Sequence, residues 1–158
     1  MTTNSLNVVL FEPEIPQNTG NIVRLCACCD CKLYLIGRLG FSMSEKYLKR
    51  SGLDYWDKVE IIRLNNFEEL LEIVKDNNIY YFTTKAKNYY TDVQYKKGDF
   101  LMFGPESRGL PLEILEYGGE NCVKLPMKEG LRSLNLSNTV AVGVYEAVRQ
   151  IGLTDVLK

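Results

Sequence analysis

The sequence predicts an α/β fold, an open and mostly parallel sheet with helices on both faces. Short apolar runs alternate along the chain with segments of helical periodicity, which is the pattern of βαβ units. The strand candidates are apolar at odd and even positions alike, as strands covered on both faces of a parallel sheet are. At 158 residues, with 46% hydrophobic and 25% charged residues, the chain has the size and composition of one globular domain. We therefore expect a single domain over residues 1–158.

Six apolar runs are the strand candidates, and five segments between and after them are the helix candidates. The strands are expected at residues 6–11, 32–36, 59–63, 79–84, 100–103 and 122–125. The helices are expected at about residues 18–29, 44–52, 66–76, 111–116 and 135–151. Asn18 or Thr19 would cap the first helix. Asn66 and Glu69 form a capping box for the third helix, and Pro111 suits the first position of the fourth.

The last predicted helix has almost no polar face in its first turns. It begins at Asn135 or Ser137, runs through the apolar residues 140–144 and ends before Gly152. A helix that is apolar all round is buried on all sides. The residues that cover it belong either to the same chain or to a second subunit, and the sequence leaves both alternatives open.

The formal net charge is −1, so the chain lacks the overall basic character of many nucleic-acid-binding proteins. An RNA partner would have to bind a local basic patch, and the sequence offers two. The first comprises Lys46, Lys49, Arg50 and Lys58; the second, in an expected mobile loop over residues 85–98, comprises Lys85, Lys87, Lys96 and Lys97 with Tyr89, Tyr90 and Tyr95 interleaved. The aromatic rings could stack on unpaired bases. The alternative for each patch is an ordinary solvated surface.

Histidine is absent and cysteine is clustered, which narrows the possible chemistry. Without histidine there is no Ser-His-Asp or Cys-His nucleophile and no imidazole base. Of the five cysteines, Cys26 and Cys29 have the spacing of a zinc knuckle, but no second pair follows, and neighbours on one helix cannot all face one ion. We expect no metal and interpret the cysteines as reduced apolar filler, with metal binding as the minor alternative.

The chain shows no sign of a membrane or export segment. No apolar run is long enough to span a bilayer, and the N-terminus lacks a signal-like stretch. Reduced cysteines agree with a reducing compartment. These observations predict a cytoplasmic protein with no membrane partner.

Two loops rich in Gly, Pro, Ser and Asn follow strand candidates, at residues 104–111 and 132–138. The carboxyl ends of strands are where open α/β sheets bind ligands. The P-loop and the G-x-G-x-x-G motif are missing, which disfavours a site that grips a dinucleotide by its phosphates. Gly104 would let a ligand with an aromatic or sulfonium group approach the main chain, and Ser133 and Ser137 supply hydroxyls. The alternative is simple turn chemistry.

The first predicted helix adds a third polar element. Asn21 and Arg24 are three positions apart and therefore share a face. An arginine near a helix N-terminus is unfavourable for the helix dipole, which favours a functional role such as contact with an RNA phosphate or hydroxyl.

These three segments stand in a definite order: residues 18–24 (Asn-Thr-Gly-Asn-Ile-Val-Arg), residues 103–111 and residues 132–138. Together they resemble the three motifs of the SPOUT class of RNA ribose 2′-O-methyltransferases. Residues 9–21 and 52–55 also resemble the small members of that class that methylate the wobble nucleotide of tRNA. The resemblance covers nearly the whole chain.

The resemblance implies a fold and an activity. The fold would carry a deep trefoil knot at its C-terminal end, and the working unit would be a homodimer with the last helix at the interface. The cofactor would be S-adenosylmethionine, and the reaction 2′-O-methylation of cytidine or uridine 34 in tRNA. The alternatives are methylation of another ribose in tRNA or ribosomal RNA, a catalytically silent RNA-binding dimer, and a flavodoxin-like nucleotide binder.

The resemblance also assigns roles to individual residues. The cofactor contacts would be Phe82, Gly104, Leu125 and Ser133. The catalytic residues would be Arg24, Ser137 and Asn138, and the substrate-binding residues Asn18, Asn21, Glu106 and Arg108, with Glu106 either bracing the knot loop or contacting the ribose. Because a guanidinium stays protonated, we expect Arg24 to orient the ribose hydroxyl or a phosphate. A sulfonium is an activated methyl donor, so the protein mainly supplies alignment, and neither a metal nor a histidine is needed.

Overall fold

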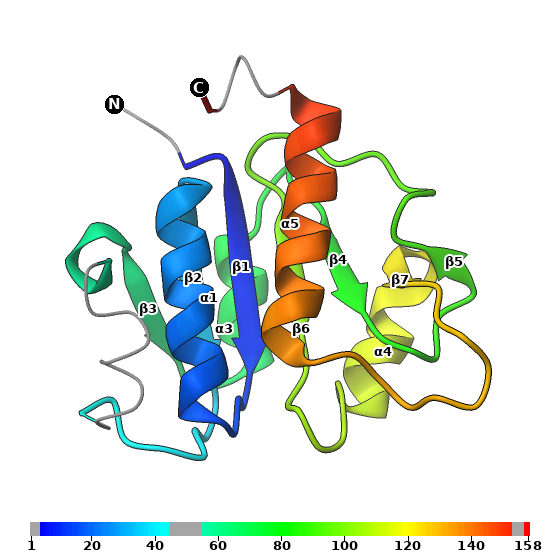
Figure 1. Cartoon of the computed structure of the whole chain (residues 1–158), viewed down its shortest axis with the longest axis horizontal. Coiled ribbons are helices and arrows are strands. Elements are labelled where there is room, and N and C mark those ends of the chain that lie inside the picture. Colours follow the sequence, from blue (N-terminus) through cyan, green and yellow to red (C-terminus); the bar gives the residue numbers. More distant parts are fainter. Residues whose placement is uncertain (1–3, 45–54, 153–156) are drawn as a thin grey trace.

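A parallel sheet of seven strands forms the middle layer of the protein, as a computed structural model of residues 4–44, 55–152 and 157–158 describes it (Figure 1). The strands are β1 (Leu6–Phe11), β2 (Cys31–Ile36), β3 (Ile61–Leu64), β4 (Ile79–Phe82), β5 (Asn88–Tyr89), β6 (Phe100–Phe103) and β7 (Cys122–Lys124). Their order in the sheet is β3-β2-β1-β6-β4-β7-β5, and every pairing between these strands is parallel. The predicted fold class is confirmed.

Helices cover both faces of the sheet, which explains why the strands are apolar at both parities. On one face lie α1 (Pro16–Cys28) and α5 (Leu136–Ile151); on the other lie α3 (Phe67–Ile73) and α4 (Leu112–Gly118) (Figure 1). In β1, Val8 and Leu10 pack in the cluster under α1 and α5, whereas Val9 packs in the cluster under α3 and α4. Two short 3-10 helices, η1 (Trp56–Lys58) and η2 (Gly119–Asn121), complete the described elements.

Helix α1 begins two residues earlier than expected. Pro16 occupies the first turn, where its fixed backbone angle suits the start of a helix, and Ile15 is the N-cap. The prediction that Asn18 or Thr19 caps the helix is therefore wrong, since both side chains are buried inside it. Arg24 consequently lies in the middle of α1. The expected unfavourable interaction between Arg24 and the helix dipole is therefore absent, because the dipole acts on charges in the first turn of a helix.

The other helix boundaries differ from the expectations in smaller ways. The Asn66 side chain caps α3 by accepting the Glu69 N–H at 3.0 Å, as predicted, but the Glu69 carboxylate bonds to the N–H of Asn65 instead of that of Asn66. Pro111 is the N-cap of α4 and not its first helical residue. Apart from residue 44, the helix expected at residues 44–52 lies outside the described residues. The same holds for Lys46, Lys49 and Arg50 of the first basic patch. The fourth member of that patch, Lys58, is exposed in η1.

The segment over residues 85–98 is more ordered than the expected loop. It contains β5, which pairs with β7, and the Tyr90 N–H donates to the Lys124 carbonyl at 2.8 Å. The side chain of Tyr95 is buried, and its hydroxyl donates to the Tyr90 carbonyl at 2.7 Å. Tyr95 is therefore not available to stack on a base, and of the three tyrosines only Tyr89 is exposed.

Helix α5 keeps one face open. Asn135 is its N-cap and Gly152, with a φ of 111°, ends it. Val140 and Val144 are buried, but Val142 is 38% and Tyr145 48% exposed. Of the two alternatives for covering this helix, complete burial within one chain is therefore wrong, and a second subunit on the open face stays a prediction. No described helix has both the length and the apolar character required to cross a membrane.

Candidate cofactor cavity and active site

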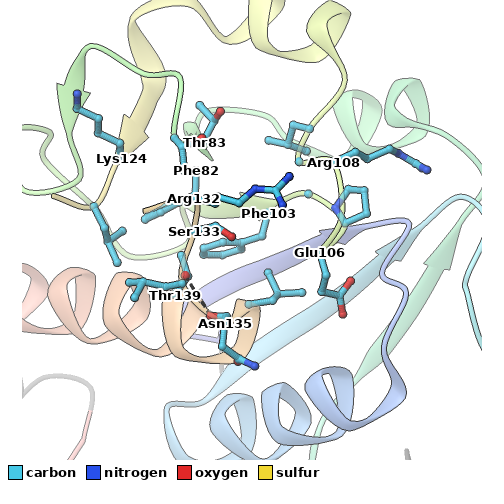
Figure 2. Close-up of a pocket in the computed structure, with 18 of the residues that line it drawn as sticks. Phe82, Thr83, Phe103, Glu106, Arg108, Lys124, Arg132, Ser133, Asn135 and Thr139 are labelled. Atoms are coloured by element: carbon cyan, nitrogen blue, oxygen red, sulfur yellow. Dashed lines mark hydrogen bonds between the residues drawn. The ribbon is translucent and has the colours of Figure 1, made fainter. Parts of the chain in front are cut away.

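A cavity of about 470 Å³ lies at the carboxyl ends of β4, β6 and β7 (Figure 2). Its walls are residues 82–85, 103–110, 123–125 and 132–136, which follow or end these strands, together with Ile15, Asn18, Met127 and Thr139. From β1 the chain continues outward through β2 to β3, whereas the later strands β4 to β7 lie on the other side of β1. The strand order therefore reverses between β1 and β6, next to the cavity. Such a reversal opens the crevice where α/β sheets bind ligands.

All four residues that the resemblance assigns to the cofactor line this cavity: Phe82, Gly104, Leu125 and Ser133. The Phe82 ring stacks on Phe103, with centroids 4.5 Å apart, and provides an apolar wall. A Cβ on Gly104 would lie 2.2 Å from the backbone nitrogen of Leu110, so only glycine fits where the loop folds back on itself. The volume suits a cofactor-sized ligand.

Two reciprocal carboxylates tie the second motif to the start of α1. Glu106 accepts hydrogen bonds from the backbone N–H groups of Glu14 at 2.8 Å and Ile15 at 2.9 Å. In return Glu14 accepts the backbone N–H and the hydroxyl of Ser107, both at 2.9 Å. A negative charge at a helix N-terminus is stabilising, so the Glu106 carboxylate favours the start of α1 from a distant loop. Of the two alternatives for Glu106, these contacts favour bracing of the loop.

Asn18 joins all three motifs in one hydrogen-bonded chain. Its amide donates to Glu106 at 3.1 Å, and its carbonyl oxygen accepts the side-chain amide of Asn135 at 3.2 Å. Asn135 in turn accepts the Ser137 hydroxyl at 2.6 Å and the backbone N–H groups of Ser137 and Asn138. Asn18 is buried within this chain. The motifs that stand apart in the sequence therefore meet at one end of the cavity.

Arg108 lines the cavity but bonds away from it. Its guanidinium lies 2.6 Å from the carboxylate of Glu12, which also accepts the Arg38 backbone N–H. Figure 2 shows the Arg108 side chain extending away from Phe103 and Ser133. A role of Arg108 in substrate binding stays a prediction.

The remaining residues of the predicted site do not line the cavity: Asn21, Arg24, Ser137 and Asn138. Asn21 and Arg24 are exposed on one face of α1, and the Arg24 guanidinium lies 5.0 Å from the centroid of the Tyr55 ring. The Ser137 hydroxyl is used in capping α5. A single chain therefore builds the candidate cofactor cavity but leaves its predicted catalytic arginine outside.

Several lining residues were not assigned from the sequence. Arg132, in the third motif, and Thr139, in the first turn of α5, line the cavity. Lys85, which follows β4, and Lys124, at the end of β7, line it too. Thr139 donates its hydroxyl to the Asn135 carbonyl at 3.2 Å, the dashed contact in Figure 2. Arg132 was part of the third motif, and its position just before the predicted cofactor residue Ser133 was the signal that could have found it.

The cysteines behave as apolar filler. All five are free, and only Cys28 is exposed. Burial raises the pKa of the Cys29 thiol to about 11, so it stays protonated at neutral pH. Within the parts of the chain that the structure describes, no group of three or more metal-binding side chains is arranged around a common point. The absence of a metal stays a prediction.

Comparison with known proteins identifies the family. The model of the SpoU rRNA methylase family matches residues 5–145. The chain belongs to the SpoU rRNA methylase family. Among SpoU relatives, the tRNA (cytidine(34)-2′-O)-methyltransferase of Aeromonas hydrophila is 50% identical over 148 residues, which cover 93% of this chain and 95% of that protein.

Two solved structures extend the likeness to the fold. One, described as giving structural insights into the 2-OH methylation of C/U34 on tRNA, has a TM-score of 0.88 and 42% identity, covering 96% of this chain and 98% of its own. The SpoU methyltransferase AviRb from Streptomyces viridochromogenes, in complex with AdoMet, has a TM-score of 0.83 at 21% identity, covering 94% of this chain and 62% of its own. The resemblance read from the three motifs is confirmed, and the SpoU family implies the predicted trefoil knot.

Proposed function

We propose that this protein transfers a methyl group from S-adenosylmethionine to the ribose 2′-hydroxyl of cytidine or uridine 34, the wobble nucleotide of tRNA. The observation that carries the proposal is the convergence of Phe82, Gly104, Leu125 and Ser133 on one cavity. It is supported by the A. hydrophila tRNA methyltransferase, which matches this chain at 50% identity over nearly its full length. The protein would act as one domain in the cytoplasm, without a metal.

The residues present fit the cofactor. The stacked rings of Phe82 and Phe103 supply an apolar wall, and the backbone around Gly104 leaves space that a side chain would fill. When bound, S-adenosylmethionine supplies a methyl group already activated by its sulfonium charge, so alignment is the main task of the protein. Ser133 and the backbone at Leu125 would hold its polar parts. The AviRb complex, whose likeness concerns the fold, is consistent with this choice of cofactor.

The hydrogen bonds that link Glu106, Asn18 and Asn135 would keep the cofactor and the ribose aligned. They fix the loop after β6 and the start of α5 against α1, so the two walls of the cavity are held in place by the fold itself. Groups held in place before the reaction lose little entropy during it. Ser137 and Asn138, at the first turn of α5, would then face the ribose at a fixed distance from the methyl group.

The position of Arg24 supports a dimer. Arg24 does not line the cavity of its own chain, although its proposed task is to orient the ribose hydroxyl or a neighbouring phosphate. Helices α1 and α5 pack side by side on one face of the sheet, and α5 exposes Val142 and Tyr145 there. We propose that two copies pair through this face, so that the exposed face of α1, with Asn21 and Arg24, lies against the second copy.

The test is methyl transfer from labelled S-adenosylmethionine to tRNA that lacks wobble methylation, followed by mapping of the labelled nucleotide. We expect the label on the ribose of nucleotide 34. Label on another ribose would contradict the choice of nucleotide and keep the methyltransferase activity. Absence of both label and cofactor binding would contradict the proposed function as a whole.

A further inference from the structure

A second hollow adjoins the cofactor cavity. It has a volume of about 230 Å³ and is formed by Thr84, Tyr89 and residues 124–131. It shares Thr84, Lys124, Leu125 and Met127 with the cofactor cavity, so the two are neighbours on the carboxyl edge of the sheet. None of the roles assigned above accounts for it.

An exposed aromatic ring forms one side of this hollow. Tyr89 stands in the edge strand β5, opposite Lys124 in β7, and its side chain is 43% exposed. The backbone N–H of Tyr89 donates to the Asp92 carboxylate at 2.8 Å, which holds the short strand in place. The Lys124 ammonium lies 5.2 Å from the centroid of the ring. Figure 2 shows the Lys124 side chain extending away from Phe103 and Ser133, and Lys124 lines both cavities.

The walls of the two cavities carry more positive than negative side chains. Lys85, Lys124, Lys128 and Arg132 line them, and in the described part of the chain none of these four forms an ion pair. The one acidic side chain of the second hollow is Glu129. By contrast, Arg108 on the opposite wall of the cofactor cavity is paired with Glu12. The hollow thus combines an exposed ring with lysines that can take an anion.

We propose that the second hollow binds a nucleotide of single-stranded RNA next to the one that is methylated, with its base stacked on Tyr89 and its phosphate bound by Lys124 and Lys128. This inference rests on the proposed function and names how its substrate is held. Base stacking on tyrosine tolerates any sequence, and lysine binds phosphate as a point charge. Single-stranded loops are where RNA offers unstacked bases to protein side chains.

The structure also supplies a matched control. Lys97 was grouped with Lys85 in one basic patch, but it precedes β6 and lies at the amino edge of the sheet, where its carbonyl accepts the amide of Asn77. Its side chain is exposed, as that of Lys128 is. A lysine removed from either place changes the net charge equally, so a difference between the two variants reports position and not charge.

The experiment measures the affinity of the intact protein for an anticodon stem–loop RNA, without turnover, at several salt concentrations. We expect Tyr89→Leu to weaken binding about tenfold and Tyr89→Phe to bind like wild type, since phenylalanine keeps the stacking ring. Lys128→Ala should lower the salt dependence by about one phosphate contact, and Lys97→Ala should not. An abasic nucleotide beside position 34 should weaken binding to wild type but not to Tyr89→Leu.

The outcomes separate this inference from the proposed function. Equal RNA affinity of wild type, Tyr89→Leu and Lys128→Ala would overturn the inference, whatever the methylation assay shows. Weakened binding of S-adenosylmethionine by Tyr89→Leu, with RNA affinity unchanged, would also overturn it, because the hollow would then extend the cofactor site. Failure of wild type to methylate nucleotide 34 would overturn the proposed function, while the binding comparison still decides the role of the hollow.

Discussion

Individual carboxylates brace the cavity wall through hydrogen bonds to the backbone. Glu106 and Glu14 each accept hydrogen bonds from the backbone of the other's loop, across 92 and 93 positions of sequence. Hydrogen bonds to a charged group contribute about 1.5–3 kcal/mol each. At this scale the sequence predicts which residues matter better than it predicts what they do, because the partner of a side chain depends on the folded chain. Glu106 is such a case: the sequence left it either contacting the ribose or bracing the loop, and only the folded chain shows that its oxygens bond to protein.

Replacement of Arg24 by alanine should abolish methyl transfer and leave the affinity for S-adenosylmethionine nearly unchanged, because Arg24 lies outside the cofactor cavity. Tyr55 positions the guanidinium through a cation–π contact, which at an exposed site contributes about 0.5–1 kcal/mol. Tyr55→Leu should therefore lower kcat only about two- to fivefold, and Tyr55→Phe should restore it. Single-turnover kinetics with a separate cofactor titration checks both. Loss of cofactor binding in Arg24→Ala would contradict the assignment.

The buried thiol of Cys29 should make folding stability depend on alkaline pH. Burial raises its pKa from an ordinary value near 9 to about 11 in the folded protein. The unfolded chain therefore releases this proton first, and stability present below pH 9 is lost as the pH rises to about 11, by up to about 2–3 kcal/mol. Urea unfolding of wild type and Cys29→Ala at pH 8 and pH 10.5 measures it, and Cys29→Ala should lose less. Cys28→Ala, which removes an exposed thiol, should lose as much as wild type.

The secondary-structure elements follow from the sequence where the signal is local. β1, β2 and β6 are recognisable because they are mostly apolar, with Asn7 and Lys32 as the polar exceptions, and the Asn66 cap is found because its partner lies three residues away. The start of α1 is missed because it is held by Glu106, which accepts the backbone N–H of the N-cap residue Ile15 from a loop 91 positions away. β5 is missed because two residues carry no periodicity and gain their structure from pairing with β7. The cavity is predictable at the carboxyl edge, but the link between Asn18 and Asn135 is not.

Gly143 in helix α5 leaves room for the ring of Phe82, which lines the cofactor cavity. A Cβ at this position would lie 2.9 Å from two atoms of the Phe82 ring, which is stacked on Phe103. Gly143→Ala should displace the ring and lower the affinity for S-adenosylmethionine several-fold. Overpacking costs about 1–3 kcal/mol, of which a better helix residue offsets about 1, so the net loss of stability should be small. Isothermal titration and thermal unfolding check this.

Ala141→Gly is the control for that variant. It weakens the same helix by about 1 kcal/mol without adding an atom near Phe82. Cofactor affinity should therefore stay at the wild-type value in Ala141→Gly. An equal loss of affinity in the two variants would mean that helix stability, and not the position of the Phe82 ring, sets the affinity.

At the scale of the whole molecule, the helices on both faces of the sheet leave some apolar side chains exposed, which is ordinary for a protein surface. On the face of α3 and α4 these are Ile73, Leu112 and Tyr117. On the face of α1 and α5, Val142 and Tyr145 are exposed three positions apart on α5, and Arg24 is exposed on the neighbouring α1. The arrangement agrees with the proposed pairing of two chains through α5.

A charge placed on that face should separate the chains. Val142→Glu buries a carboxylate in the proposed interface, so we expect sedimentation of a monomer and loss of methyl transfer with the fold intact by circular dichroism. Leu112→Glu makes the same kind of change on the opposite face and should stay a dimer with wild-type activity. A monomeric wild type, or a Val142→Glu variant with the mass of wild type, would contradict the dimer through α5.

The hydrogen bond between Asn18 and Asn135 spans 117 positions, and β1 pairs with the central strand β6 through residues such as Asn7 and Phe100, which are also far apart in sequence. Contacts so far apart in sequence make folding slow. During synthesis, the nascent chain exposes β1 and the apolar face of α1 long before residues 132–139 leave the ribosome to close the cavity. The cofactor therefore has no complete site to bind on a partly made chain and cannot stabilise it. The yield of active protein should depend on how well the nascent chain is kept from aggregating during that interval.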